Sequence, residues 1–505
     1  MKYNDWFVLI AAVVGPPAAA AASCESLKAL ALPDSTITFA QSVPAGELNL
    51  PGASAAAARQ YQELPAFCRV AATLKPTSDS DIGIEVWMPA SGWNGKFQAV
   101  GNGGWAGSIS YSAMGQALRR GYATASTDTG HTGGSARFAL GHHEKLIDFG
   151  YRAVHEMTVK SKSIVAAFYG AAPKLSYWNG CSTGGRQGLK EAQQYPADFD
   201  GIIAGAPANF RTHLQVGQIW TASATLKDPA SFIPPAKYTL IHKAAVDACD
   251  ALDGVKDGLL ENPLRCHFDP KVLECKGDDT PACLTTPQVE AARKIYAGAK
   301  NPRNGLQIWP GLMRGSELGW GQTAGGPEPI GLAMEYFRYV VFEDPNWNWR
   351  TFNFDTDTVR TDKLEYGMNA TDPNLKQFVG HGGKLLLYHG WSDQLITPMN
   401  SISYYKSVVD TMGGAAKTAD FARLFLAPGM GHCGGGEGPN SFDVVSALEE
   451  WVEKGTAPEQ MMASHLTNGT VDRTRPLCPY PQVATWKGVG STDAVGSFVC
   501  AVERP

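Results

Sequence analysis

The residues best suited to chemistry in this 505-residue chain form one short stretch, Gly180-Cys181-Ser182-Thr183-Gly184. Its pattern, G-x-S-x-G, is typical of a sharp turn between a strand and a helix that exposes a serine hydroxyl for nucleophilic attack. Glycines are needed there because the turn packs strand against helix without room for Cβ atoms, and the serine adopts an unusual backbone conformation. The flanks agree, since 175–179 alternates like a strand and 186–195 has a helical pattern.

A serine hydroxyl is a poor nucleophile at neutral pH, so it needs a base, and the base needs an orienting carboxylate. Proteins with this turn carry these groups in the order Ser, Asp or Glu, His. Asp393 follows a strand-like run at 385–388, and His432 follows another at 424–426. Each residue alone is equally compatible with an ordinary loop position. Together, in this order and at the carboxyl ends of strands, they predict Ser182 as nucleophile, Asp393 as orienting acid and His432 as base. The other histidines considered do not follow the last predicted strand: His131, His142, His143 and His389.

Acyl chemistry at a serine also needs two backbone N–H donors for the developing oxyanion. The residue after the nucleophile, Thr183, supplies one of them. We expect the second from the glycine-rich loop 101–107, where Gly103 and Gly104 are the candidates. The alternative is that this loop is only a flexible turn.

The elements that must position these residues can be recognised from short apolar runs, which predict buried strands at 97–100, 122–127, 175–179, 202–204, 385–388 and 424–426. Helical patterns lie between them, notably at 151–169. Strands that alternate with helices predict an α/β fold with a mostly parallel, doubly wound sheet.

The interval between the predicted strands at 202–204 and 385–388 is too long for a single crossover helix. We therefore expect residues 209–371 to form an inserted lid domain, with the catalytic domain built from 23–208 and 372–505. The insertion is rich in proline and in aromatic residues. These aromatics could stack on a phenolic acyl group or form the core of the lid itself.

Composition limits the partners and the compartment. The net charge of −5 and the pI of about 6.1 give no support for binding to nucleic acid or to an anionic membrane. Lys2, the apolar run 6–14 and the alanines before Ser23 predict a signal peptide at 1–22, whereas the alternative is a cytosolic alanine-rich tail. No other run is apolar enough to span a bilayer. Ten cysteines, an even number, predict five disulfides in a secreted chain, and no C-x-x-C pair indicates zinc.

Asp250, Asp253 and Asp257 fall within eight residues that include Gly254, and Gly258 follows directly. Carboxylates this close repel each other unless they are solvated or bind a hard cation such as Ca²⁺. The register is not that of an EF-hand loop. On the residues alone, an acidic surface turn is favoured over a calcium site.

With these residues assembled, the chain resembles the tannase and feruloyl esterase family, which also contains the PET-monoester hydrolase. The likeness covers nearly the whole mature chain and is carried by the cysteine spacing and by the motifs at 101–107, 180–187 and 429–433. The resemblance implies an α/β-hydrolase fold with a large inserted lid and the catalytic roles given above, whereas secretion is expected from the N-terminal segment and the cysteines. It implies no organic cofactor.

The resemblance also implies the disulfide pairing and a metal. The pairs would be Cys24 with Cys68, Cys181 with Cys433, Cys249 with Cys266, Cys275 with Cys283, and Cys478 with Cys500. A structural Ca²⁺ in the lid would be held by the carboxylates of Asp250, Asp253 and Asp257 and by the carbonyls of Val255 and Leu259.

The chain is most like the feruloyl esterases, which implies hydrolysis of hydroxycinnamic esters through an acyl-enzyme, with plant cell walls as one source of substrate. Tannase activity on galloyl esters and hydrolysis of mono(2-hydroxyethyl) terephthalate are alternatives within the family. The PET-monoester hydrolase has Glu after its nucleophile, where this chain has Thr183, and its carboxylate-binding arginine has only loose counterparts in Arg314, Arg338 and Arg350. A prolyl-oligopeptidase-like peptidase would add blade repeats that are not visible. A catalytically silent binding protein would not need the intact triad.

Overall fold

The computed structural model describes residues 22–503, so the expected signal peptide lies outside the described residues except for Ala22. Nine strands form the main sheet in the order β1-β2-β3-β5-β4-β6-β7-β10-β11. Their bounds are β1 Ser35–Val43, β2 Phe67–Leu74, β3 Ile82–Pro89, β4 Lys96–Val100, β5 Ala123–Thr127, β6 Leu175–Cys181, β7 Gly201–Gly205, β10 Lys384–Gly390 and β11 Ala422–Ala427. The strands predicted from the sequence are confirmed as β4, β5, β6, β7, β10 and β11.

The predicted strands form the parallel half of the sheet, from β5 through β4, β6, β7 and β10 to β11. The other half is an antiparallel extension in which β1 pairs with β2, β2 with β3, and β3 with β5. The carboxyl ends of all the parallel strands meet at one edge, which is where an α/β sheet forms its site. The α/β fold with a doubly wound sheet is therefore confirmed.

Both faces of the parallel half are buried by helices. Alternate side chains of a strand point to opposite faces, and in β10 Leu385 and Leu387 join one apolar cluster whereas Leu386 joins another. The first cluster includes residues of α4 (Ala153–Tyr169), α5 (Thr183–Gln194) and α13 (Met399–Thr411). The second includes residues of α2 (Tyr111–Arg119) and α15 (Val444–Lys454). Because helices cover both faces of this half of the sheet, side chains on either face of a strand are buried, and the strands appear in the sequence as continuous apolar runs.

Two predicted helices are confirmed with shifted starts. The pattern at 151–169 is α4, which follows a π-helical turn at Asp148–Arg152 and ends at Gly170, whose φ of +71° forms a left-handed cap. The pattern at 186–195 is α5, which begins earlier, at Thr183. The glycines at the start of α5 weaken the helical pattern in the sequence, so the prediction began too late. Packing requires them, since a Cβ on Gly185 would lie 2.4 Å from the carbonyl oxygen of Gly205.

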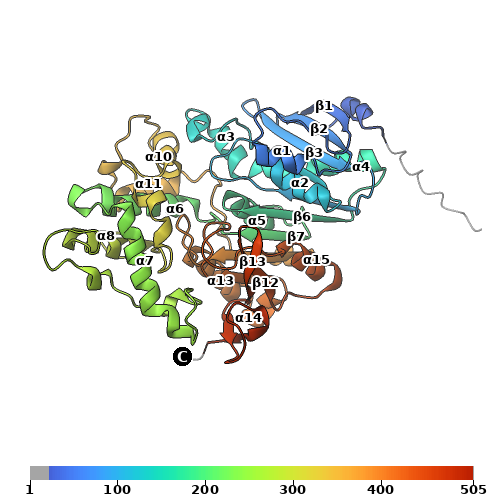
Figure 1. The fold of residues 1–505 in the computed structure, drawn as a ribbon. Helices are drawn as coiled ribbons and strands as arrows, with labels where there is room; N and C mark the ends of the chain where they lie inside the picture. The colour runs from blue at the N-terminus through green and yellow to red at the C-terminus, as the bar shows by residue number, and fades with distance from the viewer. Residues whose placement is uncertain (1–21, 504–505) are drawn as a thin grey trace, which may run out of the picture.

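The segment between β7 and β10 adds no strand to the main sheet. Its helices are α6 Arg211–Leu226, α7 Pro235–Cys249, α8 Thr286–Ala297, α9 Gly321–Ala324, α10 Gly331–Glu335, α11 Thr356–Lys363 and α12 Lys376–Gly380, with a small hairpin of β8 Ala299–Lys300 and β9 Gln307–Trp309. Figure 1 shows α6, α7, α8, α10 and α11 gathered beside the sheet. We call this segment the lid; the limits 209–371 stay a prediction.

Most lid aromatics are buried in apolar clusters. One cluster contains Tyr238 and Trp320. A second contains Tyr336 and Phe337 together with Trp105 from the loop after β4. These side chains therefore serve the packing of the lid and its junction with the catalytic domain.

The remaining elements are α1 Ala55–Tyr61, α3 His143–Ile147, α14 Ala415–Ala419, and two C-terminal hairpins, β12 Met461–Thr467 with β13 Thr470–Leu477 and β14 Gln482–Trp486 with β15 Phe498–Val502. All five expected disulfides are confirmed: Cys24–Cys68, Cys181–Cys433, Cys249–Cys266, Cys275–Cys283 and Cys478–Cys500. Among the described residues, no helix combines the length and the apolarity that crossing a membrane requires.

Candidate active site

Ser182 sits at the junction of β6 and α5 with φ +62° and ψ −120°, a conformation that residues with a side chain rarely adopt. Hydrogen bonds on both sides hold it there. Its N–H donates to the carbonyl of Gly205 at 2.9 Å, and its carbonyl accepts from the N–H groups of Arg186 and Ala208, both at 3.0 Å. The geometry is that of the strand-turn-helix expected from the sequence, with the serine at the tip of the turn.

Glycines bring the loop after β4 against this turn. A Cβ on Gly180 would lie 2.5 Å from the carbonyl of Gly184, and one on Gly101 would lie 2.5 Å from the Cα of Gly184. Both contacts are too short for any side chain. Glycine is therefore required in both the loop 101–107 and the turn 180–184, because the backbones of these two segments pass very close to each other.

Polar contacts fix the register of the same approach. The Asn102 N–H donates to Gln187 Oε1 at 3.1 Å, and Gln187 Nε2 donates to Asn102 Oδ1 at 3.0 Å. The Thr183 hydroxyl donates to the carbonyl of Gly104 at 2.9 Å. The sequence did not single out Asn102 and Gln187. They hold the loop that carries Gly103 and Gly104 beside the serine.

Within residues 22–503, the N–H of Thr183 has no acceptor, as is normal for the first residue of a helix. It therefore remains able to bind an oxyanion. Gly104 has φ +56°, and a Cβ there would lie 3.1 Å from Leu332 of the lid, whereas Gly103 has open space. Both glycines lie in the loop beside the turn.

Asp393 and His432 lie on loops after the neighbouring parallel strands β10 and β11. His432 Nδ1 donates to Asp393 Oδ2 at 2.7 Å. The other carboxylate oxygen, Oδ1, accepts from the N–H groups of Leu395 and Ile396 at 2.8 and 2.9 Å. Asp393 is fully buried, and the His432 side chain keeps 14% of its surface exposed. The pair expected from sequence order is thus in hydrogen-bonding contact.

His389, set aside by the sequence argument, contacts the same carboxylate. Its Nε2 lies 3.1 Å from Asp393 Oδ2 and 2.9 Å from the carbonyl of Ile396. Because both neighbours are acceptors, Nε2 carries the proton, and Nδ1 then accepts from the hydroxyl of Ser401 at 2.8 Å. His389 therefore positions Asp393. A single histidine inside a buried strand gave no sequence signal for this role.

The pKa of Asp393 lies below its usual range. Burial alone would raise this pKa, but the His432 imidazole and the hydrogen bonds from His389 and His432 outweigh burial. Asp393 is therefore ionised at neutral pH and stabilises a positive charge on His432.

A disulfide joins the two catalytic loops. Cys181 precedes Ser182 and Cys433 follows His432, and their Cα atoms are 6.0 Å apart. Cys433 itself has φ +63°. The turn and the histidine loop are thus tied one residue from each of the two side chains.

The acidic loop expected to hold calcium follows α7. Asp250 Oδ1 and Oδ2 accept from the N–H groups of Asp257 and Gly258 at 3.1 and 3.0 Å. Asp253 Oδ1 accepts from the N–H of Val255 at 2.9 Å. Burial, with Asp257 and Asp250 close by, raises the pKa of Asp253 to about 6.

The charges of this loop suit a hard cation. Glu261 is buried beside the loop, and its Oε2 makes no hydrogen bond to the described residues, although Arg475 Nη1 lies 3.6 Å away. Arg475 pairs with Asp257 and Glu261, so one guanidinium faces several carboxyl groups. Val255 and Leu259 lie buried in the same loop. Oxygen donors with excess negative charge fit Ca²⁺.

Three lid arginines are loose counterparts of the arginine with which the PET-monoester hydrolase binds a carboxylate. In this structure each of them makes other contacts. Arg314 donates to the carbonyl of Phe268. Arg338 pairs with Glu328 at 3.4 Å. Arg350 lies over the ring of Trp349.

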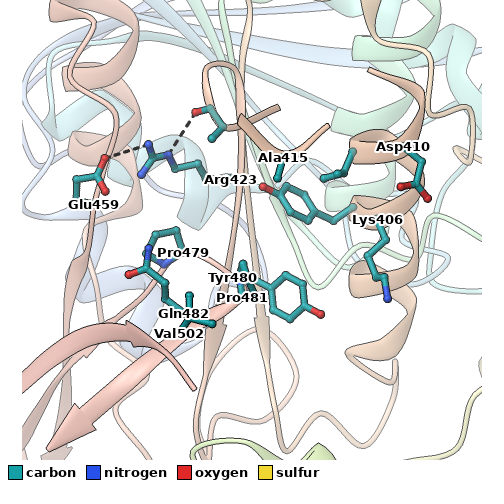
Figure 2. Close-up of a pocket in the computed structure, with 13 residues that line it drawn as sticks. Lys406, Asp410, Ala415, Arg423, Glu459, Pro479, Tyr480, Pro481, Gln482 and Val502 are labelled. Carbon is teal, nitrogen blue, oxygen red and sulfur yellow. Dashed lines mark hydrogen bonds and ion pairs between the residues drawn. The ribbon is translucent and has the colours of Figure 1, made fainter. Parts of the chain in front are cut away.

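A cavity of about 430 Å³ lies between α13, α14 and the C-terminal segment (Figure 2). Figure 2 shows Arg423 directed at Glu459 in this cavity, with Nη2 and Oε1 3.0 Å apart. Arg423 is near the start of β11, whereas His432 follows the end of that strand. The cavity is therefore at the opposite edge of the sheet from Ser182 and does not belong to the candidate active site.

The strand order, the serine turn and the Asp–His pair define an α/β-hydrolase. A family model described as tannase and feruloyl esterase matches residues 68–501. The chain belongs to the tannase and feruloyl esterase family, and it is a carboxylic ester hydrolase.

Relatives cover nearly the full length of the chain. It is 40% identical to an uncharacterized esterase of Xanthomonas campestris pv. campestris, over 97% of this chain and 92% of that protein. It is 35% identical to a probable feruloyl esterase B-2 of Aspergillus terreus, over 95% of each. The crystal structure of feruloyl esterase B from Aspergillus oryzae superposes with a TM-score of 0.88 at 32% identity, over 95% of this chain and 99% of that one.

Proposed function

We propose that the protein is a secreted serine esterase that hydrolyses esters of hydroxycinnamic acids. The observation that carries this proposal is the 2.7 Å contact between His432 Nδ1 and Asp393 Oδ2, on a loop tied by a disulfide to the turn of Ser182. The choice of acyl group is supported by relatives named as feruloyl esterases.

The proposed reaction proceeds in two halves. His432 removes the proton of the Ser182 hydroxyl through Nε2 as the serine attacks the ester carbonyl. The N–H of Thr183 and that of Gly103 or Gly104 bind the oxyanion; loss of one such donor typically lowers kcat about 10²- to 10³-fold. His432 then protonates the leaving alcohol. Water, activated by the same histidine, releases the acid from Ser182. No organic cofactor takes part.

Kinetics with matched esters test the proposal. We expect kcat/KM for methyl ferulate to exceed the values for methyl gallate, mono(2-hydroxyethyl) terephthalate and methyl butyrate. Ser182→Ala should remove all four activities. A wild-type preference for the gallate or for the terephthalate monoester would assign the enzyme to one of those substrates instead. Turnover of methyl ferulate no faster than that of methyl butyrate would reject an aromatic acyl site.

We also propose that the acidic loop binds a structural Ca²⁺ through the carboxylates of Asp250, Asp253 and Asp257 and the carbonyls of Val255 and Leu259. The loop lies in the lid, so the ion would stabilise the lid and would not take part in the chemistry.

Secretion is proposed from the expected signal peptide and from five disulfides, which persist in oxidising compartments. Plant cell-wall esters are the proposed natural substrates. A mature N-terminus at Ser23 in protein recovered outside the cytoplasm would support processing, and an intact Met1 would oppose it.

A further inference from the structure

The first lid helix, α6, connects the two loops on either side of the serine. At its start, the guanidinium carbon of Arg211 lies 4.4 Å from the ring centroid of Trp105, which follows Gly104. Two turns later, Gln218 Nε2 lies 3.4 Å from the carbonyl of Leu395, two residues after Asp393. Positions 211, 215 and 218 share one face of a helix. Gln215 therefore lies between the contacts to the oxyanion loop and to the Asp393 loop.

Polar atoms on this face lack partners. Within residues 22–503, no hydrogen-bond partner is present for Arg211 Nε and Nη2 or for either amide atom of Gln215, nor for the hydroxyl of Tyr336, which belongs to the segment Tyr336–Val341. Arg211 is only 2% exposed and Gln215 is fully buried. A buried polar group without a partner is strongly destabilising, and a buried unpaired charge more so. The described residues therefore leave these hydrogen bonds to be completed by another group, either water or a ligand.

The charge at Arg211 also has no carboxylate partner among the described residues, and its neighbour is the Trp105 ring. Burial lowers the pKa of Arg211 to about 10, and no carboxylate contributes to this shift. Arg186 is a useful contrast, because it is equally buried but donates to the carbonyls of Phe149, Gly150 and Met368. Arg211 makes no such bonds to the described residues, although Tyr336 lies close enough to affect its pKa. Arg211 is therefore a donor held ready next to the oxyanion loop.

We propose that Arg211 and Gln215 bind a hydroxyl group on the aromatic ring of the acyl moiety. This inference rests on the proposed function and adds the residues that select the ring substituent. A ring hydroxyl accepts a hydrogen bond from the Arg211 guanidinium and donates one to Gln215 Oε1. A carboxylate only accepts, so it would leave Gln215 Oε1 without a donor. A second carboxylate on the ring would pair with the charge of Arg211, so Gln215 Oε1, which needs a donor, is the atom that favours a phenolic ring.

Two esters that differ by one hydroxyl test this inference: methyl cinnamate and methyl 4-hydroxycinnamate. Because hydrogen bonds to charged groups are the stronger ones, we expect Arg211→Met to lower kcat/KM for the hydroxylated ester about 10- to 100-fold. The value for methyl cinnamate should change less than about threefold. Gln215→Leu should act in the same direction. Arg350→Met, at an exposed lid arginine, should leave the ratio of the two values unchanged.

Wild-type enzyme provides a second readout that does not depend on a variant folding. The inhibition constant of 4-hydroxycinnamate should be at least about tenfold lower than that of cinnamate. Equal inhibition by the two acids, or equal losses on both esters in Arg211→Met, would overturn the inference. A lower inhibition constant for 4-carboxycinnamate than for 4-hydroxycinnamate would also overturn it. Failure of the wild type to hydrolyse either ester would instead contradict the proposed function.

Discussion

Asp393 illustrates at the residue scale how the site is held before substrate arrives. Its carboxylate accepts N–H groups from His432, His389, Leu395 and Ile396. With its hydrogen-bonding capacity filled, the side chain has one orientation, and that orientation fixes the tautomer of His432 with the proton on Nδ1. Its Nε2 is thereby left free to act as the base.

Thr183 gives a residue-scale prediction about the oxyanion loop. Its hydroxyl donates to the carbonyl of Gly104. Thr183→Val removes this donor with little change in shape, so we expect kcat to fall about tenfold with KM nearly unchanged, because small displacements in an active site are costly. Thr183→Ser keeps the hydroxyl and is the control. Equal kcat values for the two variants in steady-state kinetics would show that the bond does not position the loop.

At the element scale, the Cys181–Cys433 disulfide closes a loop of 252 residues and joins two catalytic loops. In the chain-entropy model such a link stabilises the fold by about 5 kcal/mol, and the 22-residue link Cys478–Cys500 by about 3 kcal/mol. Both are important for stability, but only the first lies at the site.

Replacing both members of each pair separates the two effects. We expect Cys181→Ala with Cys433→Ala to lower kcat more than it raises KM, because the serine and histidine loops lose their relative order. Cys478→Ala with Cys500→Ala should lower only the midpoint of thermal unfolding. Kinetics are measured well below both midpoints. A folded Cys181/Cys433 variant with wild-type kcat would mean that the bond contributes to stability alone.

His242 links two elements of the lid to the histidine loop. Its Nδ1 lies 3.0 Å from Glu317 Oε2, and its Nε2 lies 2.8 Å from Glu437 Oε2, five residues after His432. Burial alone would lower the pKa of His242, but the two carboxylates outweigh burial and raise it to about 9.

The sign of this shift sets a pH prediction. The pKa of His242 lies above its usual value of 6.5. Protonated His242 therefore contributes its full stabilisation of the folded state below pH 6.5, and this contribution is lost as the pH rises through about 9. His242→Gln should therefore lower the free energy of unfolding at pH 6 clearly more than at pH 10. His465→Gln, at an exposed pair with Asp472, is the control for a surface histidine. If His242→Gln lowered the free energy of unfolding equally at both pH values, the stabilising role of the charged His242 would be contradicted.

What the sequence could predict depended on burial. The parallel strands are covered on both faces and stand out as apolar runs, whereas β1 is exposed along most of its length. Strand β3 contains Glu85, which is buried because Arg69 pairs with it at 2.6 Å. Such partners cannot be seen in a single strand, so this half of the sheet was missed.

The residues of the site likewise fall into those that the sequence predicts and those that depend on contacts between distant parts of the chain. Ser182, Asp393 and His432 follow from chain order and strand ends. His389 and Arg211 did not follow, because their roles depend on contacts made only in the folded chain: His389 with Asp393, and Arg211 with Trp105.

At the scale of the whole molecule, the lid and the catalytic domain share an apolar cluster that includes Trp105, Phe149, Tyr336 and Phe337. The Trp105 indole N–H also donates to the carbonyl of Leu332 at 3.1 Å. The loop that carries Gly103 and Gly104 is thus packed directly beneath the lid. We therefore expect substitutions that loosen the packing of the lid to displace the oxyanion loop through the contact of Trp105 with the lid.

Calcium removal tests the stability of the lid within the whole protein. An ion present at about 100 times its dissociation constant stabilises the folded state by about 2.7 kcal/mol. We expect EDTA to lower the unfolding midpoint and Ca²⁺, but not Mg²⁺, to restore it. Asp253→Asn should abolish this response, and Asp269→Asn, at a surface ion pair with Arg293, should retain it. A midpoint insensitive to EDTA and to added Ca²⁺ would rule out the proposed ion.

The most direct test of the account is to trap the acyl-enzyme. Wild-type protein is mixed rapidly with 4-nitrophenyl ferulate, quenched in acid and analysed by peptide mass spectrometry. We expect a burst of nitrophenol and a feruloyl adduct on Ser182, both absent from Ser182→Ala. An adduct on another residue, or steady hydrolysis with no burst and no adduct while Ser182→Ala keeps its activity, would contradict the account.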